Sequence, residues 1–192
     1  LQAADFSAVA TAYLRLSTAL MAQIAAVLGD PAAADRYRRI SDGARAAWLA
    51  EFVTADGTVT PDTQATLVRA LAFYLVSPDL RPTLADRLAQ SIKAADTHLG
   101  TGFLATPHLL PVLADTGHLD VAYELLLSDS EPSWLTMIDR GATTVWEQWH
   151  GVDADGVPAL TLATVLATGT TASLVLCAPR TGRTHQLRVH LA

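Results

Sequence analysis

The residues best suited to chemistry lie in one short segment, in which Glu147 stands between Trp146 and Trp149. Cleavage of a glycosidic bond uses two carboxyl groups, one that protonates the leaving oxygen and one that acts as base or nucleophile. Flat aromatic rings beside a carboxylate also suit a sugar, and Trp134 adds a third indole upstream. A Trp-x-x-Trp pair is nevertheless more often core packing than a ligand contact, so the pattern alone leaves both interpretations open.

Helical periodicity fills most of the chain before this segment. Apolar residues recur at three-and-four spacing and predict helices over 5–28, 31–52, 82–95, 107–115 and 118–127, with one more that starts at Thr60-Pro61-Asp62 and carries Leu67, Leu71 and Tyr74. The predicted apolar face of the first helix comprises Val9, Ala12, Tyr13, Leu16, Leu20, Ile24 and Val27, and that of the second comprises Tyr37, Ile40, Ala44, Ala47 and Trp48. The stretches 98–107 and 128–151 are predicted to be loops.

The pattern changes after Gly156. Residues Thr161 to Cys177 are rich in Thr, Val and Leu, with Gly169 in the middle, and this predicts two strands joined by a turn. We therefore expect a boundary near residue 157, with a mainly α part over 1–157 and a separate segment over 158–192. Helical hairpins of this length stack into bundles, solenoids or closed toroids. The sequence shows no repeat of fixed period, so a repeat family is not supported.

Composition narrows the functional classes. The net charge of −6 argues against nucleic-acid binding by the chain as a whole, because such proteins need a cationic face. The single cysteine, Cys177, excludes an internal disulfide and a cysteine-based zinc site, and we expect no metal and no cofactor. No apolar run of about 18 residues is present, so no membrane-spanning helix is predicted. The compartment stays undetermined, with the cytoplasm slightly favoured.

Several blocks of the chain together strongly resemble the catalytic domain of bacterial α-L-rhamnosidases, glycoside hydrolases with an (α/α)6 barrel. The resemblance extends over about residues 5–157. It implies a partial (α/α)6 toroid of helical hairpins, followed by a short C-terminal β appendage. The blocks that carry it include His98-Leu99-Gly100-Thr101-Gly102, Thr106-Pro107-His108, Asp115-Thr116-Gly117-His118, Pro132-Ser133-Trp134 and Gly141-Ala142-Thr143-Thr144-Val145-Trp146-Glu147-Gln148-Trp149.

The resemblance also implies roles for individual residues. Glu147 matches the general base of an inverting reaction, which would activate the water that attacks the anomeric carbon of a terminal α-L-rhamnose. The indoles of Trp134, Trp146 and Trp149 would shape the rhamnose pocket. His98 and Thr101 would lie on a neighbouring loop that faces the same cavity. The expected partner is a rhamnose-containing glycoside.

The chain departs from the family pattern in two places. Nothing in it matches the Asp-Glu-Arg-Leu-Gly-Trp-like block that carries the general acid. The family's Asn-His segment downstream of the base is replaced by Leu166 to Thr171, which contains no His. A base without its acid partner supports little turnover, so we expect a piece of a rhamnosidase.

The last part of the chain resembles another family. The run from Arg180 to Ala192 is similar to the C-terminal motif of RNA pseudouridine synthases, which implies RNA contacts by Arg180, Arg183, His185 and Arg188. The His-Arg-Leu-Asp block that carries the catalytic Asp of those enzymes has no counterpart here. An RNA-binding or synthase piece is therefore the alternative hypothesis, and a helical scaffold without activity is a third. The net charge favours the rhamnosidase over the RNA hypothesis.

Overall fold

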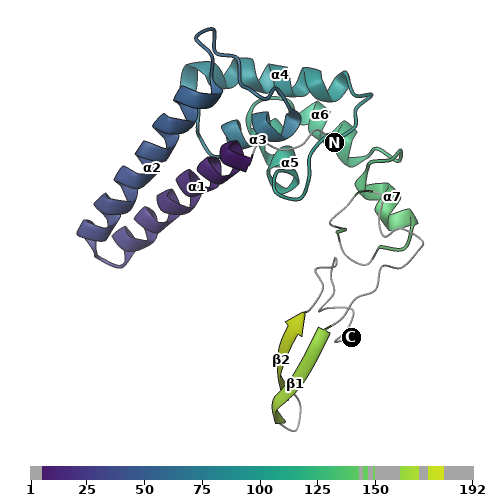
Figure 1. Cartoon of the computed structure of the whole chain (residues 1–192). Helices are drawn as coiled ribbons and strands as arrows, with labels where there is room; N and C mark the ends of the chain where they lie inside the picture. The colour runs from purple at the N-terminus through teal and green to yellow at the C-terminus, as the bar shows by residue number, and fades with distance from the viewer. Residues whose placement is uncertain (1–5, 143–144, 147–148, 150–160, 169–172, 180–192) are drawn as a thin grey trace.

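The computed structural model of the protein describes residues 6–142, 145–146, 149, 161–168 and 173–179. These residues form helices that follow one another along the chain, and two strands near its end (Figure 1). The elements are α1 (Phe6–Val27), α2 (Pro31–Phe52), α3 (Gln64–Ala72), the 3-10 turn η1 (Pro78–Leu80), α4 (Arg81–Lys93), α5 (Thr106–Asp115), α6 (Leu119–Leu126), α7 (Trp134–Asp139), β1 (Thr161–Thr168) and β2 (Ser173–Pro179).

Helices α1 and α2 lie side by side as a hairpin (Figure 1), within two residues of the predicted bounds. Gly29 allows the sharp reversal between them, because its φ of 74° lies in the left-handed region that glycine tolerates. Asp30 then caps α2, since its side chain accepts a 2.9 Å hydrogen bond from the backbone N–H of Ala33. Pro31 follows as the first helical residue, where its missing N–H costs nothing.

The buried face of this hairpin differs from the predicted one. Small residues of α1 pack against α2, among them Ala8, Ala12, Ala22 and Ala25. The larger side chains that we expected in the core are exposed, with Leu20 at 48%, Ile24 at 50% and Val27 at 88%, and Ile40 of α2 is also exposed. The predicted faces were wrong at these positions, because alanine lets two helix backbones approach closely and the apolar stripe then points away from the partner helix.

Helix α3 begins later than predicted, at Gln64. Thr63 is its N-cap, and the Thr63 hydroxyl accepts a 3.2 Å hydrogen bond from the backbone N–H of Thr66. Tyr74, expected on this helix, lies beyond its end with a φ of 51° and is mostly exposed. Helix α4 buries Leu84, Leu88 and Ile92, the residues that its periodicity predicted.

Helices α5 and α6 occur where the sequence predicts them, but α7 lies within the stretch expected to be a loop. Only six residues long, α7 is too short to show a helical period. Its N-cap is Ser133, whose hydroxyl accepts a 3.1 Å hydrogen bond from the backbone N–H of Thr136. That cap was the one local signal for this helix.

The helices pair in sequence order, α1 with α2, α3 with α4 and α5 with α6, so the fold is mainly α and built of consecutive hairpins. A common apolar core joins the pairs, and its fully buried large side chains include Trp48, Phe73, Leu88, Ile92, Leu109 and Leu125. No helix in the described part of the chain is long and apolar enough to cross a membrane.

Strands β1 and β2 form an antiparallel pair, with Thr161 opposite Pro179 and Thr168 opposite Ser173. The register shifts once, between Val165 and Ala167. The expected boundary near residue 157 falls outside the described residues, so the division of the chain at that point stays a prediction.

Candidate active site

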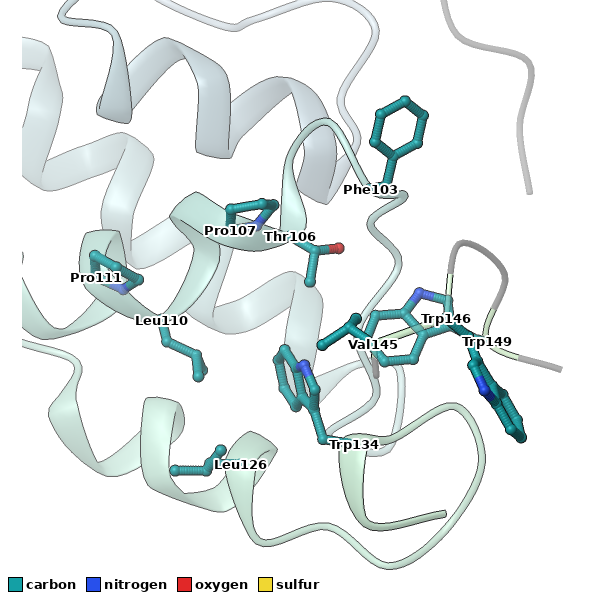
Figure 2. A pocket seen from close by; sticks show the side chains of 10 residues that line it. All are labelled: Phe103, Thr106, Pro107, Leu110, Pro111, Leu126, Trp134, Val145, Trp146 and Trp149. Carbon is teal, nitrogen blue, oxygen red and sulfur yellow. The ribbon is translucent and has the colours of Figure 1, made fainter. Parts of the chain in front are cut away.

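A cavity of about 770 Å³ opens between α5, α6, α7 and the segment 145–149 (Figure 2). This volume lies within the range of small-molecule sites. The structure brings together three of the predicted sugar-contacting residues here, Trp134, Trp146 and Trp149. Its lining residues in the described part of the chain are Phe103, Thr106, Pro107, Leu110, Pro111, Leu126, Trp134, Val145, Trp146 and Trp149.

The wall of the cavity is almost entirely apolar. Among the lining residues that the structure describes, Thr106 supplies the one hydroxyl group, and none carries a carboxyl group. Indole rings present flat surfaces that suit the C–H face of a sugar ring. The wall can therefore hold and orient a ligand, but acid–base chemistry at this place needs carboxyl groups from other residues.

Glu147, the predicted general base, lies outside the described residues, as do Thr143 and Thr144. Its sequence neighbour Trp146 and the nearby Trp149 both line the cavity. The described residues on either side of Glu147 and Gln148 in the sequence therefore both belong to the cavity wall.

Trp149 is held by two interactions. Its indole N–H donates a 2.8 Å hydrogen bond to the carbonyl oxygen of Thr101. Its ring meets that of Trp134 edge-on, with ring centres 5.4 Å apart at 90°, a favourable aromatic geometry. Trp149 therefore packs against protein groups and also forms part of the wall, and its contact with a sugar stays a prediction.

His98 and Thr101 are not among the lining residues of the cavity. The two ring nitrogens of His98 contact the carbonyl oxygen of Ala95 at 3.0 Å and the hydroxyl of Ser130 at 2.8 Å. Thr101 is fully buried, and its hydroxyl lies 2.7 Å from that of Thr106. Because their polar groups already have protein partners, direct contact of these two residues with substrate stays a prediction.

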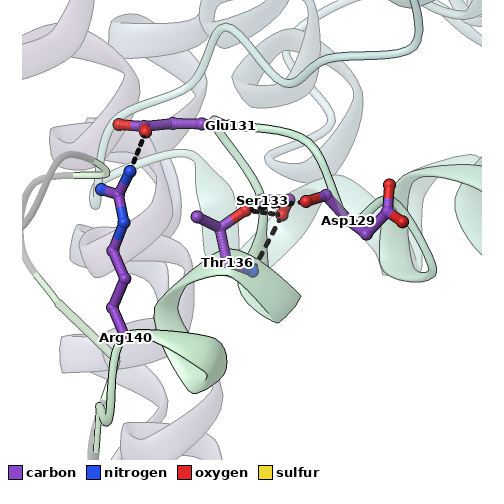
Figure 3. A network of polar contacts seen from close by, with 5 residues as sticks. All are labelled: Asp129, Glu131, Ser133, Thr136 and Arg140. Carbon is purple, nitrogen blue, oxygen red and sulfur yellow. Dashed lines mark hydrogen bonds and ion pairs between the residues drawn. The ribbon is translucent and has the colours of Figure 1, made fainter.

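Polar contacts fix the start of α7 (Figure 3). The first residue of this helix is Trp134. The hydroxyls of Ser133 and Thr136 lie 2.7 Å apart, and Thr136 also donates to the carbonyl oxygen of Asp129 at 3.2 Å. Arg140, just after the helix, forms an ion pair with Glu131. These contacts close the loop around Ser133, which is buried, so that Trp134 is directed into the cavity (Figure 2).

Burial shifts the pKa of two groups near α5, His108 and Tyr13. Burial lowers the pKa of His108, whose ring packs edge-on against Phe73 at 5.0 Å. Burial also raises the pKa of Tyr13, and the neighbouring Arg69 opposes that shift in part. The Tyr13 hydroxyl donates a 2.7 Å hydrogen bond to the carbonyl oxygen of Leu104, which ties the loop before α5 to α1.

Sequence reasoning missed much of the cavity wall. Phe103, Leu126 and the α5 residues Pro107, Leu110 and Pro111 were not predicted as site residues, yet all line the cavity. The α5 residues recur at three-and-four spacing, so they share one helix face. That periodicity could have indicated a face, although not what it borders.

Within the described part of the chain, no three His, Cys, Asp or Glu residues are grouped so that they could hold a metal ion. The residues of the RNA hypothesis, Arg180, Arg183, His185 and Arg188, lie outside the described residues.

Consecutive helical hairpins beside a tryptophan-lined cavity are the arrangement expected of part of a six-hairpin glycosidase domain. The chain belongs to the family described as the bacterial α-L-rhamnosidase six-hairpin glycosidase domain, whose model matches residues 2–161. The expected family is therefore confirmed, and the match covers all of the described helices.

Three relatives illustrate this membership. An α-L-rhamnosidase of Streptomyces avermitilis is 49% identical over 150 residues, which make up 77% of this chain and 14% of the relative. Its crystal structure, complexed with L-rhamnose, matches 76% of this chain with a TM-score of 0.69 and 47% identity. An Alteromonas sp. α-L-rhamnosidase is 40% identical over 148 residues, or 76% of this chain and 16% of the relative.

The third relative is a solved fungal structure. The Aspergillus terreus α-L-rhamnosidase matches 76% of this chain and 17% of its own length, with a TM-score of 0.70 and 32% identity. The chain therefore spans only about one seventh of the length of the curated Streptomyces relative. These matches favour the glycosidase over the RNA hypothesis.

Proposed function

We propose that this chain forms one wall of the active site of an α-L-rhamnosidase, in which Glu147 is the general base of an inverting hydrolysis. The observation that carries the proposal is the convergence of Trp134, Trp146 and Trp149 on one cavity. Glu147 follows Trp146 directly in the chain, and this sequence neighbourhood supports the assignment of its carboxylate to the same site.

The chemistry of the sugar supports this proposal. L-Rhamnose is a 6-deoxyhexose, so it carries a methyl group where most hexoses carry a hydroxymethyl group. A largely apolar wall, on which Thr106 carries the one hydroxyl group among the described lining residues, suits the methyl group and the C–H face of such a sugar. The Streptomyces avermitilis relative was crystallised with L-rhamnose, and this chain is 47% identical to it in the matched region.

The proposed reaction needs a second carboxyl group. In an inverting glycosidase the acid and the base lie about 6.5–9.5 Å apart, which leaves room for the attacking water. The base removes a proton from that water as it attacks the anomeric carbon, while the acid protonates the departing oxygen. No block of this chain matches the acid-bearing motif of the family, so we expect this chain to bind the sugar and to turn it over very slowly by itself.

The end of the rhamnosidase portion is also part of the proposal. We place it near residue 157, and the family model, which stops at residue 161, supports that position.

A titration of the chain with L-rhamnose, followed by tryptophan fluorescence, tests the proposal. We expect a saturable change with L-rhamnose and a weaker one with L-mannose, which differs in carrying the hydroxymethyl group. Glu147→Gln should weaken the response, and Trp146→Ala should abolish it. Absence of a response to L-rhamnose, or an identical titration for wild type and Glu147→Gln, would contradict the proposed site.

A further inference from the structure

The side chain of Gln64 makes an unusual contact for the first residue of a helix. It is buried, and its amide bonds to the backbone of a segment that lies far away in the chain. Its Nε2 donates to the carbonyl oxygen of His98 at 3.1 Å, and its Oε1 accepts from the N–H of Gly100 at 2.6 Å. The side-chain amide thus pairs with the backbone of 98–100 as a neighbouring strand would.

Gly100 makes this approach possible. A Cβ atom at position 100 would lie 3.3 Å from Cδ of Gln64, closer than most real contacts of that kind. The hydrogen bond at Gly100 is also short for an N–H donor. The fit between Gln64 and residue 100 is therefore tight, and it leaves the backbone of 98–100 little freedom to shift.

The segment 98–101 connects the two hydrogen bonds of the Gln64 side chain to the cavity wall. Its first residue, His98, contacts Ser130 in the loop that precedes α7 and Trp134. Its last residue, Thr101, is fully buried and accepts the hydrogen bond of the Trp149 indole through its carbonyl oxygen. Gln64 and Trp149 thus both bond to the backbone of 98–101. Trp149 is among the lining residues of the cavity, and Gln64 is not.

We propose that Gln64 is a positioning residue of the active site: by clamping the backbone of 98–100 it fixes the Thr101 carbonyl, which holds the indole of Trp149 at the cavity wall. That this wall belongs to an active site rests on the proposed function, whereas the link to Trp149 stands on the contacts described above. Replacing the buried Gln64 amide with an apolar group is costly, because the His98 carbonyl and the Gly100 N–H would both lose this hydrogen-bond partner.

The indole N–H signals of the chain in an NMR spectrum test this proposal. Trp48 supplies an internal reference, since its indole also donates to a backbone carbonyl, that of Ala8 at 3.1 Å, in the α1–α2 hairpin. The variants Trp48→Phe and Trp149→Phe assign the two signals. Gln64→Met keeps the length of the side chain and removes both hydrogen bonds, and Gln23→Met is the matched control, because Gln23 is exposed on α1.

We expect Gln64→Met to shift the Trp149 signal and to speed its hydrogen exchange by about fivefold, the factor that one hydrogen bond of ordinary net strength provides. The Trp48 signal should not change, and Gln23→Met should change neither. Equal changes in the indole signals of Trp48 and Trp149 would show that Gln64 supports the fold in general. An unchanged Trp149 signal would show that the Gln64 hydrogen bonds do not position Trp149. Either result overturns the proposal.

Gln64→Glu gives a second test, including for the case that Gln64→Met does not fold. A carboxylate can still accept from Gly100 but cannot donate to the carbonyl of His98, whereas a protonated carboxyl can do both. The Trp149 signal should therefore return toward its wild-type position as the pH falls and the introduced carboxylate is protonated. A Trp149 signal that does not follow this titration contradicts the clamp.

L-Rhamnose titrations of the same variants separate this inference from the proposed function. If wild type binds L-rhamnose, Gln64→Met should weaken binding by about the same fivefold factor. Unchanged binding with a shifted Trp149 would remove the link to the active site. If wild type does not bind the sugar while Trp149 still responds to Gln64→Met, the proposed function fails and the positioning of Trp149 by Gln64 stands.

Discussion

The indole N–H of Trp149 lies 2.8 Å from the carbonyl oxygen of Thr101, a residue 48 positions earlier in the chain. This hydrogen bond joins two loops that both border the cavity. Thr101 precedes α5, which forms one side of the wall, and Trp149 ends the segment that forms another. The bond therefore fixes the distance between two parts of the candidate active site that the chain itself does not hold together.

Replacing Trp149 with Phe should destabilise the chain and weaken L-rhamnose binding. The variant loses the hydrogen bond to Thr101, worth about 1 kcal/mol, and the smaller ring adds the cost of a cavity beside Trp134. Trp48→Phe is the matched control, because it loses an equivalent bond to the Ala8 carbonyl. Urea unfolding should show a loss for both variants, and the sugar titration should change only for Trp149→Phe. A sugar affinity reduced equally in both would contradict a local role for Trp149.

The N-cap of α3 offers a second test, since it sets the place of Gln64. Thr63→Ala removes the acceptor for the backbone N–H of Thr66 and should cost about 1 kcal/mol in the free energy of unfolding. Thr63→Ser retains that acceptor and should cost much less. Chemical denaturation of the two variants distinguishes these outcomes, and equal losses would show that the methyl group of Thr63 matters more than its hydroxyl.

The apolar stripe of α1 should make the isolated chain associate. Leu20, Ile24, Val27 and Leu28 are all about half exposed or more, and such patches favour self-association. Ile24→Lys should lower the apparent mass in light scattering and reduce the fluorescence of a bound hydrophobic dye, with a stability change within about 0.5 kcal/mol. Gln23→Lys adds the same charge beside the stripe and should do less. Unfolding by Ile24→Lys would mean that the position is buried.

The apolar stripe of α1 also shows that the sequence predicts the position of a helix better than the face that it buries. Spacing located α1, α2, α4, α5 and α6 well, because apolar periodicity depends only on residues close in sequence. It could not tell which face of α1 meets α2. Helix α1 has two apolar faces that could pack against α2, one of alanines and one of larger side chains. In the structure the alanine face is the buried one.

The candidate site was predictable in part for the same reason. The tryptophans could be named because their types and spacing are visible in one short segment. The contacts of Gln64 with His98 and Gly100 join residues more than 30 positions apart. No local sequence pattern indicates that a glutamine makes hydrogen bonds to such a distant backbone segment. The side chains of His98 and Thr101 contact protein groups that lie far from them or several residues away in the chain, and contact of these two residues with substrate stays a prediction.

Stability should depend on pH through His108. Burial lowers the pKa of its imidazole below the ordinary 6.5, so the folded chain favours the neutral ring more than the unfolded chain does. Between the lowered value and pH 6.5 the unfolded state binds more protons, and the free energy of unfolding therefore falls as the pH drops through this window. Above pH 6.5 the ring is neutral in both states and contributes no slope.

His108→Gln removes this titration and keeps a polar side chain next to Phe73. The difference in melting temperature between wild type and variant should be constant above pH 6.5 and should move in favour of the variant below it. Because the same carboxylates titrate in both proteins, their contribution cancels in the difference. A difference that stays constant on both sides of pH 6.5 would show that His108 is hydrated in the folded chain, so that its packing against Phe73 would not exclude water from the ring.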